Sequence, residues 1–149
     1  MERVLVIAYG NPLRSDDGIA WQAAEKLRQE LPDIAGIICV HQLTPELAEE
    51  VALADLVIFL DASRNGEAGS IRSDAVFAQP GELRFSHHLA PAEVLDLCAR
   101  LYSAKPQAFL ISAHGQCFDH GHELSQLAVL AVPEVVAEVS RLITFESRN

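Results

Sequence analysis

The sequence predicts an α/β protein, a three-layer sandwich in which a mostly parallel, twisted sheet carries helices on both faces. Short apolar runs rich in β-branched residues alternate along the chain with segments in which apolar residues recur at helical spacing. Half of the 149 residues are hydrophobic, enough to build a sizeable core. No internal repeat or linker divides the chain, so we expect one domain over residues 1–149.

The first predicted strand begins at Val4 and ends at the turn residues Gly10-Asn11-Pro12. A loop then leads to Asp16 and Asp17, just before a helix predicted over Ile19–Leu31. Backbone N–H groups and the helix dipole favour negative charge at a helix N-terminus. The two carboxylates are therefore either helix caps or functional groups.

Two more strands and a helix are predicted next. Gly36–His41 is an apolar run, and Thr44-Pro45 after it favours a helix start, with Thr44 as the cap. Leu56–Leu60 is the most continuous apolar run after the first, and it ends abruptly at Asp61. The inward face of the helix between these strands is predicted to hold Leu47, Ala48, Val51 and Ala52.

The second half of the chain is less regular. Turn residues surround a possible short strand over Ile71–Ala78. A helix is predicted after Pro91, then a strand over Ala108–Ala113 and a last helix from about Ser125, which Pro133 should kink or restart. The inward stripe of the helix after Pro91 is predicted to be Val94, Leu95, Cys98 and Leu101.

Charge and cysteine usage exclude several classes of protein. The net charge of −10 repels phosphate backbones, so we expect no nucleic-acid partner. The three cysteines are far apart and form no CxxC pair, which argues for reduced thiols and against a disulfide framework. No signal peptide and no apolar run of about 20 residues is present. We therefore expect a cytoplasmic protein with no membrane partner.

Candidate chemical groups follow the predicted strands. Ligands of open α/β sheets bind beyond the carboxyl ends of the strands, where Asp16, Asp17 and Asp61 are expected. His87 and His88 precede the third helix and can reach the same edge. Two carboxylates and an imidazole suit nickel, zinc or manganese. Alternatively, Asp61 only accepts hydrogen bonds from loop amides, and one histidine caps the helix or lies in solvent.

A second histidine group lies in the loop from His114 to His122, which also holds His120 and Asp119. This loop suggests an alternative function, a nickel or zinc carrier module without proteolysis, although a solvated loop is the simpler interpretation. Cys117 in the same loop has histidines nearby for cysteine catalysis. The Gly-rich dinucleotide fingerprint, the GxSxG elbow, the HExxH motif and the GxxxxGK[ST] loop are all missing.

Four segments together resemble the hydrogenase maturation endopeptidase family, and the similarity runs from Val4 to about Leu142. The opening strand followed by Gly-Asn, Leu and a pair of acids before Gly is the most specific of them. The segments are Gly10-Asn11-Pro12-Leu13 through Asp16-Asp17-Gly18, Thr44-Pro45-Glu46-Leu47, Phe59-Leu60-Asp61-Ala62 and Ser86-His87-His88-Leu89.

The resemblance implies a protease that removes the C-terminal extension of a nickel-iron hydrogenase large-subunit precursor after nickel insertion. The family's metal-contacting residues correspond to Asp17, Asp61 and His87, with His88 as the alternate, and Asp17 stands where relatives often have glutamate. The resemblance implies that nickel is presented by the precursor and that other divalent metals can substitute for it. The attacking water would be activated by the metal or by Asp16, with Asp16 and Asp17 as candidate catalytic residues. The family is filed with the aspartic-type endopeptidases, and we expect a monomer.

Overall fold

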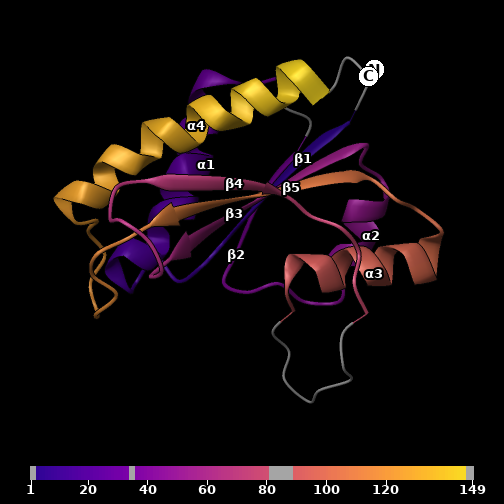
Figure 1. Ribbon diagram of the computed structural model, residues 1–149, viewed down its shortest axis with the longest axis horizontal. Coiled ribbons are helices and arrows are strands. Elements are labelled where there is room, and N and C mark those ends of the chain that lie inside the picture. Colours follow the sequence, from indigo (N-terminus) through magenta and orange to yellow (C-terminus); the bar gives the residue numbers. More distant parts are fainter. Residues whose placement is uncertain (1–2, 34–35, 81–88, 147–149) are drawn as a thin grey trace.

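Five strands form one sheet in the order β2-β1-β3-β5-β4 (Figure 1). The computed structural model describes residues 3–33, 36–80 and 89–146. Four strands run parallel, and β4 at the edge pairs antiparallel with β5. The strands are β1 (Val4–Tyr9), β2 (Gly36–Val40), β3 (Leu56–Ser63), β4 (Ile71–Ala75) and β5 (Gln107–His114).

Helices cover both faces of the sheet, which confirms the predicted fold class (Figure 1). On one face, α1 (Ile19–Glu30) packs beside α4 (Gln126–Glu146). On the other face, α2 (Leu47–Ala52) packs beside α3 (Pro91–Tyr102). A short 3-10 helix, η1 (Ser15–Gly18), joins the loop after β1 to α1.

The side chains of β3 alternate between two hydrophobic cores. Leu56, Ile58 and Leu60 pack in the core beneath α1 and α4. Val57 and Phe59 pack in the core beneath α2 and α3. All five side chains are buried because helices cover both faces of the sheet, and this explains why the sequence of the strand is continuously apolar. Each fully buried side chain of this size stabilises the fold by about 1.5–3 kcal/mol.

Several predicted boundaries were wrong. Strand β3 continues through Asp61 to Ser63 because its backbone keeps pairing with β5. The second helix starts at Leu47, since Thr44 and Pro45 form a turn whose carbonyls accept hydrogen bonds from Leu47 and Ala48. Thr44 is therefore not its cap.

Three further predictions need correction. Strand β4 ends at Ala75, three residues earlier than expected. Leu101 is 63% exposed and does not join the inward stripe of α3. Helix α4 continues through Pro133, so this proline does not begin a new helix. Across the described residues, no helix combines the length and the apolar character that a membrane span requires.

Candidate functional site

Polar side chains replace apolar ones where β1, β3 and β5 approach their carboxyl ends. Tyr9 is the last residue of β1, Asp61 lies near the end of β3, and His114 ends β5. Because side chains alternate along a strand, Asp61 lies on the same face as Val57 and Phe59, toward α2 and α3. This is the edge at which open α/β sheets bind their ligands.

Asp61 is a partly buried carboxyl group with an unusual proton affinity. Burial raises its pKa to about 6, against the lowering effect of hydrogen bonds from the Tyr9 hydroxyl and the Ala62 backbone N–H. The negative charge of Asp17 raises the pKa further. The sequence predicted this residue as a candidate, but its partner Tyr9 was missed.

Asp17 is fixed over the end of β1 by the turn that follows the strand. Its Oδ2 accepts a hydrogen bond of 2.7 Å from the backbone N–H of Asn11. Gly10 has a φ of +145°, and a Cβ there would overlap the backbone carbonyl oxygen of Asp17. Glycine at position 10 therefore permits the close approach that brings Asp17 to this edge.

Asp17 and Asp61 together form an acidic pair that fits a divalent cation. They come from η1 and β3, yet they are close enough for the charge of Asp17 to act on the pKa of Asp61. A cation between them would relieve their mutual repulsion.

Asp16 is directed away from this pair into the protein. Its side chain is fully buried and accepts four hydrogen bonds. Oδ2 accepts from the backbone N–H groups of Gln116 and Cys117 at 2.7 and 2.9 Å and from the Ser125 hydroxyl at 2.7 Å. Oδ1 accepts from the backbone N–H of Ser125 at 2.7 Å. Burial alone would raise the pKa of Asp16, but these hydrogen bonds lower it below its usual value.

Asp16 does not cap the helix next to it in sequence but contacts the residue that precedes a distant helix. No side chain caps η1 or α1, so Asp16 does not cap the helix that follows it in sequence. It binds Ser125 instead, the residue before α4, whose hydroxyl accepts a hydrogen bond from Ala128 at 3.3 Å. Serine is a common residue just before a helix, and this preference at Ser125 is the one feature of the sequence that points to a role for this position.

The predicted histidine ligand lies outside the described residues. His87 and His88 belong to residues 81–88, so the structure places neither ring relative to Asp17 and Asp61. Among residues 3–33, 36–80 and 89–146, no group of three or more His, Cys, Asp or Glu side chains is arranged to hold a metal ion. The described part of the candidate site is therefore its two acids and Tyr9.

The loop from His114 to His122 does not form the centre that a metal carrier needs. His114, His120 and His122 are all described, and they assemble into no metal-holding group. His114 is 8% exposed, with its ring against Gly66, where a Cβ would lie 2.5 Å from ring atoms. Its buried Nδ1 has no hydrogen-bond partner, and His120 and His122 are exposed.

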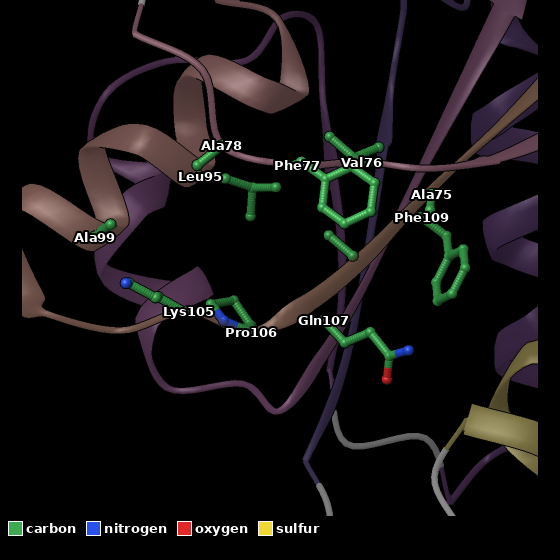
Figure 2. Close-up of a pocket in the computed structure, with 11 residues that line it drawn as sticks. Ala75, Val76, Phe77, Ala78, Leu95, Ala99, Lys105, Pro106, Gln107 and Phe109 are labelled. Carbon is green, nitrogen blue, oxygen red and sulfur yellow. The ribbon is translucent and has the colours of Figure 1, made fainter. Parts of the chain in front are cut away.

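An apolar groove lies at the opposite end of the sheet (Figure 2). It has a volume of about 450 Å³, and Lys105 is its only titratable lining residue. It lies where β4 ends and β5 begins, beside α3, and so is separate from the acidic edge. The lining carries no acid, histidine or cysteine, so this groove lacks the carboxylates that mark the acidic edge.

The structure matches solved hydrogenase maturation endopeptidases over nearly its whole length. HybD from E. coli superimposes with a TM-score of 0.73 at 22% identity, covering 95% of this chain and 92% of that one. HybD from Thermococcus kodakarensis, a [NiFe] hydrogenase maturation protease, gives 0.74 at 23% identity, covering 94% and 98%. An endopeptidase from Escherichia coli, solved in solution, gives 0.74 at 24% identity, covering 95% and 93%.

These matches confirm, at the level of the fold, the resemblance that the sequence motifs indicate. No protein-family model matches the chain, and no curated protein matches it in sequence.

Proposed function

We propose that this chain is a hydrogenase maturation endopeptidase, a hydrolase that removes the C-terminal extension of a nickel-iron hydrogenase large-subunit precursor. The observation that carries the proposal is the acidic pair Asp17 and Asp61, held at the carboxyl edge of a sheet whose fold is that of such endopeptidases. The Gly10-Asn11 turn that positions Asp17 belongs to the motif on which the sequence resemblance rests.

Recognition of the substrate would depend on the nickel that the precursor carries. In this proposal Asp17 and Asp61 contact the ion through carboxylate oxygens, and His87, or His88 as the alternate, supplies an imidazole nitrogen. The pair fits a divalent cation because its two negative charges repel each other. A precursor without nickel would leave that repulsion in place, so it would bind less tightly.

The roles of the two neighbouring acids differ in this proposal. Asp16 is a poor general base, because its oxygens already accept four hydrogen bonds and its pKa is lowered. We assign it a structural role. Nickel presented by the precursor would supply a charge that lowers the pKa of a bound water, and Asp17 and Asp61 would hold the ion. The enzyme would be metal-dependent through its substrate, and Asp17 would act as a contact to the ion.

The partner and setting are part of the same proposal. The partner is the nickel-loaded precursor, and other divalent ions can replace nickel in vitro. The net charge of −10 disfavours nucleic acid as a partner. We propose that the protein acts as a monomer in the cytoplasm.

Cleavage of nickel-loaded precursor tests the function directly. Purified wild-type chain should shorten a candidate large subunit, measured by mass spectrometry, and omission of nickel should prevent the cut. Asp61→Ala and His87→Ala should lose most of the cleavage. Asp33→Ala is the matched control, because Asp33 is an exposed aspartate after α1. Normal cleavage by both site variants would overturn nickel recognition, and no cleavage of any precursor by the wild type would overturn the proposed function.

A further inference from the structure

Tyr9 is a phenol in a strand whose other side chains are aliphatic. The side chains of β1 alternate, so Tyr9 shares a face with Leu5 and Ile7, which pack in the core beneath α2 and α3. Tyr9 is partly buried and packs against that core. Any large apolar side chain would satisfy this packing, so the hydroxyl group needs a separate explanation.

The hydroxyl of Tyr9 donates a hydrogen bond to the carboxylate of Asp61. The two strands are neighbours in parallel register, with Ala8 opposite Leu60. The next residue on each strand is Tyr9 and Asp61, which places them side by side on the same face. A phenol has an ordinary pKa of about 10, so the Tyr9 hydroxyl is protonated at neutral pH and can donate to a carboxylate.

The main chain just after Tyr9 restrains the other acid of the pair. The backbone N–H of Asn11 donates a hydrogen bond to Oδ2 of Asp17, and the Tyr9 hydroxyl donates one to the carboxylate of Asp61. Tyr9 and Asn11, two residues apart in sequence, therefore each restrain one carboxylate of the pair. Asp61 also accepts a hydrogen bond from the backbone N–H of Ala62, and each carboxylate keeps lone pairs that these donors do not occupy.

We propose that Tyr9 is a positioning residue for Asp61: its hydroxyl donates to the carboxylate and so fixes the orientation in which the remaining lone pairs face the cation of the substrate. This rests on the proposed function, in which Asp61 contacts that cation. Carboxylate ligands in metal sites are commonly oriented by such a hydrogen-bond donor, and loss of the donor typically weakens metal binding by about 10–100-fold. Tyr9 would act through Asp61 without touching the ion.

The test compares Tyr9→Phe with Tyr102→Phe. The chain has two tyrosines, and Tyr102 is 48% exposed at the end of α3, so its variant is a matched control. Titration of each protein with nickel(II), followed by paramagnetic broadening of the backbone amide signals of Asp17 and Asp61, gives its affinity. We expect Tyr9→Phe to weaken nickel binding by about tenfold. Tyr102→Phe should bind as the wild type does.

A double-mutant cycle separates positioning from packing. In an Asp61→Ala background, Tyr9→Phe should cause no further loss of nickel affinity, because the residue through which it acts is gone. Amide spectra before nickel addition verify that each variant is folded. Equal affinity of Tyr9→Phe and wild type would overturn the inference. So would a loss that persists in the Asp61→Ala background, or a wild-type chain that gives no response to millimolar nickel.

The nickel titration and the cleavage assay can fail independently. The wild-type chain could bind nickel through Asp61 and yet cleave no precursor. That result would contradict the proposed function but not the role of Tyr9 in positioning Asp61 toward a cation. If the wild type cleaves, Tyr9→Phe should lower kcat/KM for nickel-loaded precursor by about tenfold, while Tyr102→Phe leaves it unchanged. Unchanged kcat/KM in Tyr9→Phe would overturn the inference and leave the proposed function intact.

Discussion

Asp16 and Ser125 are 109 residues apart in sequence, yet the carboxylate of Asp16 accepts hydrogen bonds from both the backbone N–H and the hydroxyl of Ser125, each 2.7 Å long. Through the same carboxylate, η1 is also joined to the backbone of Gln116 and Cys117. This buried group therefore connects the segment that carries Asp17 to the loop after β5 and to the start of α4.

Asp16→Asn should destabilise the protein by about 3 kcal/mol, since charge-assisted hydrogen bonds contribute about 1.5–3 kcal/mol each and an amide NH₂ would face N–H donors. Urea unfolding at neutral pH measures the loss. The matched control is Asp33→Asn, at an exposed position, which should change the free energy of unfolding by less than about 0.5 kcal/mol. An equal effect of the two substitutions would contradict the structural role of Asp16.

The pH dependence of this contribution has a defined sign. The folded-state pKa of Asp16 is lowered, so its contribution is fully present above the unfolded pKa of about 3.9 and is lost as pH falls through the folded value. Unfolding measured between pH 6 and pH 3 should show the wild type losing stability faster than Asp16→Asn. Parallel curves for the two proteins would contradict the prediction.

Asp61 should have the opposite effect on stability. Its pKa of about 6 lies above the unfolded value, so the folded state binds the extra proton more tightly and stability falls as pH rises from about 4 to about 6. Asp61→Asn removes this titration, and it should be more stable than the wild type by about 3 kcal/mol at pH 8. The difference should shrink toward pH 4. A constant difference between the two proteins across this range would show that Asp61 has an ordinary pKa.

Gly10→Ala should destabilise the protein and displace Asp17, because the added Cβ would overlap the backbone of Asp17 at a φ of +145°. We expect a loss of about 2 kcal/mol or more in the free energy of unfolding. Gly36→Ala is the control, since its nearest neighbour is a movable Leu5 methyl group at 3.1 Å. Wild-type stability of Gly10→Ala would show that the turn rearranges at little cost.

Two substitutions at Asp17 should show whether cleavage depends on the charge of this side chain or on its length. Asp17→Asn keeps the shape but removes the negative charge, so we expect kcat/KM for nickel-loaded precursor to fall by about 10–100-fold. Asp17→Glu keeps the negative charge on a longer side chain and should stay within about tenfold of the wild type. Mass spectrometry of the precursor over time gives both values. If Asp17→Asn cleaves better than Asp17→Glu, charge at position 17 is not what the reaction requires.

Several parts of the site could be predicted from short segments of sequence. The turn at Gly10 and the acids after it are adjacent in the chain, and Asp61 directly follows an apolar run. Tyr9 was missed because a tyrosine that ends an apolar run reads as an ordinary core residue. The alternation of side chains along a strand places Tyr9 on the same face as Leu5 and Ile7. Its contact with Asp61, however, depends on which strand lies beside β1, and the sequence does not show this.

Apolar periodicity and turn chemistry are local properties, so they suffice to predict the α/β class, the strands and helices within a few residues of their ends, and the candidate acids Asp17 and Asp61. The packing of distant segments is what places Asp16 against Ser125 and its neighbour Asp17 near Asp61. Adjacent carboxylates have the same intrinsic chemistry. Burial and long-range hydrogen bonds, which exist only once distant segments pack together, lower the pKa of Asp16 and give it a structural role.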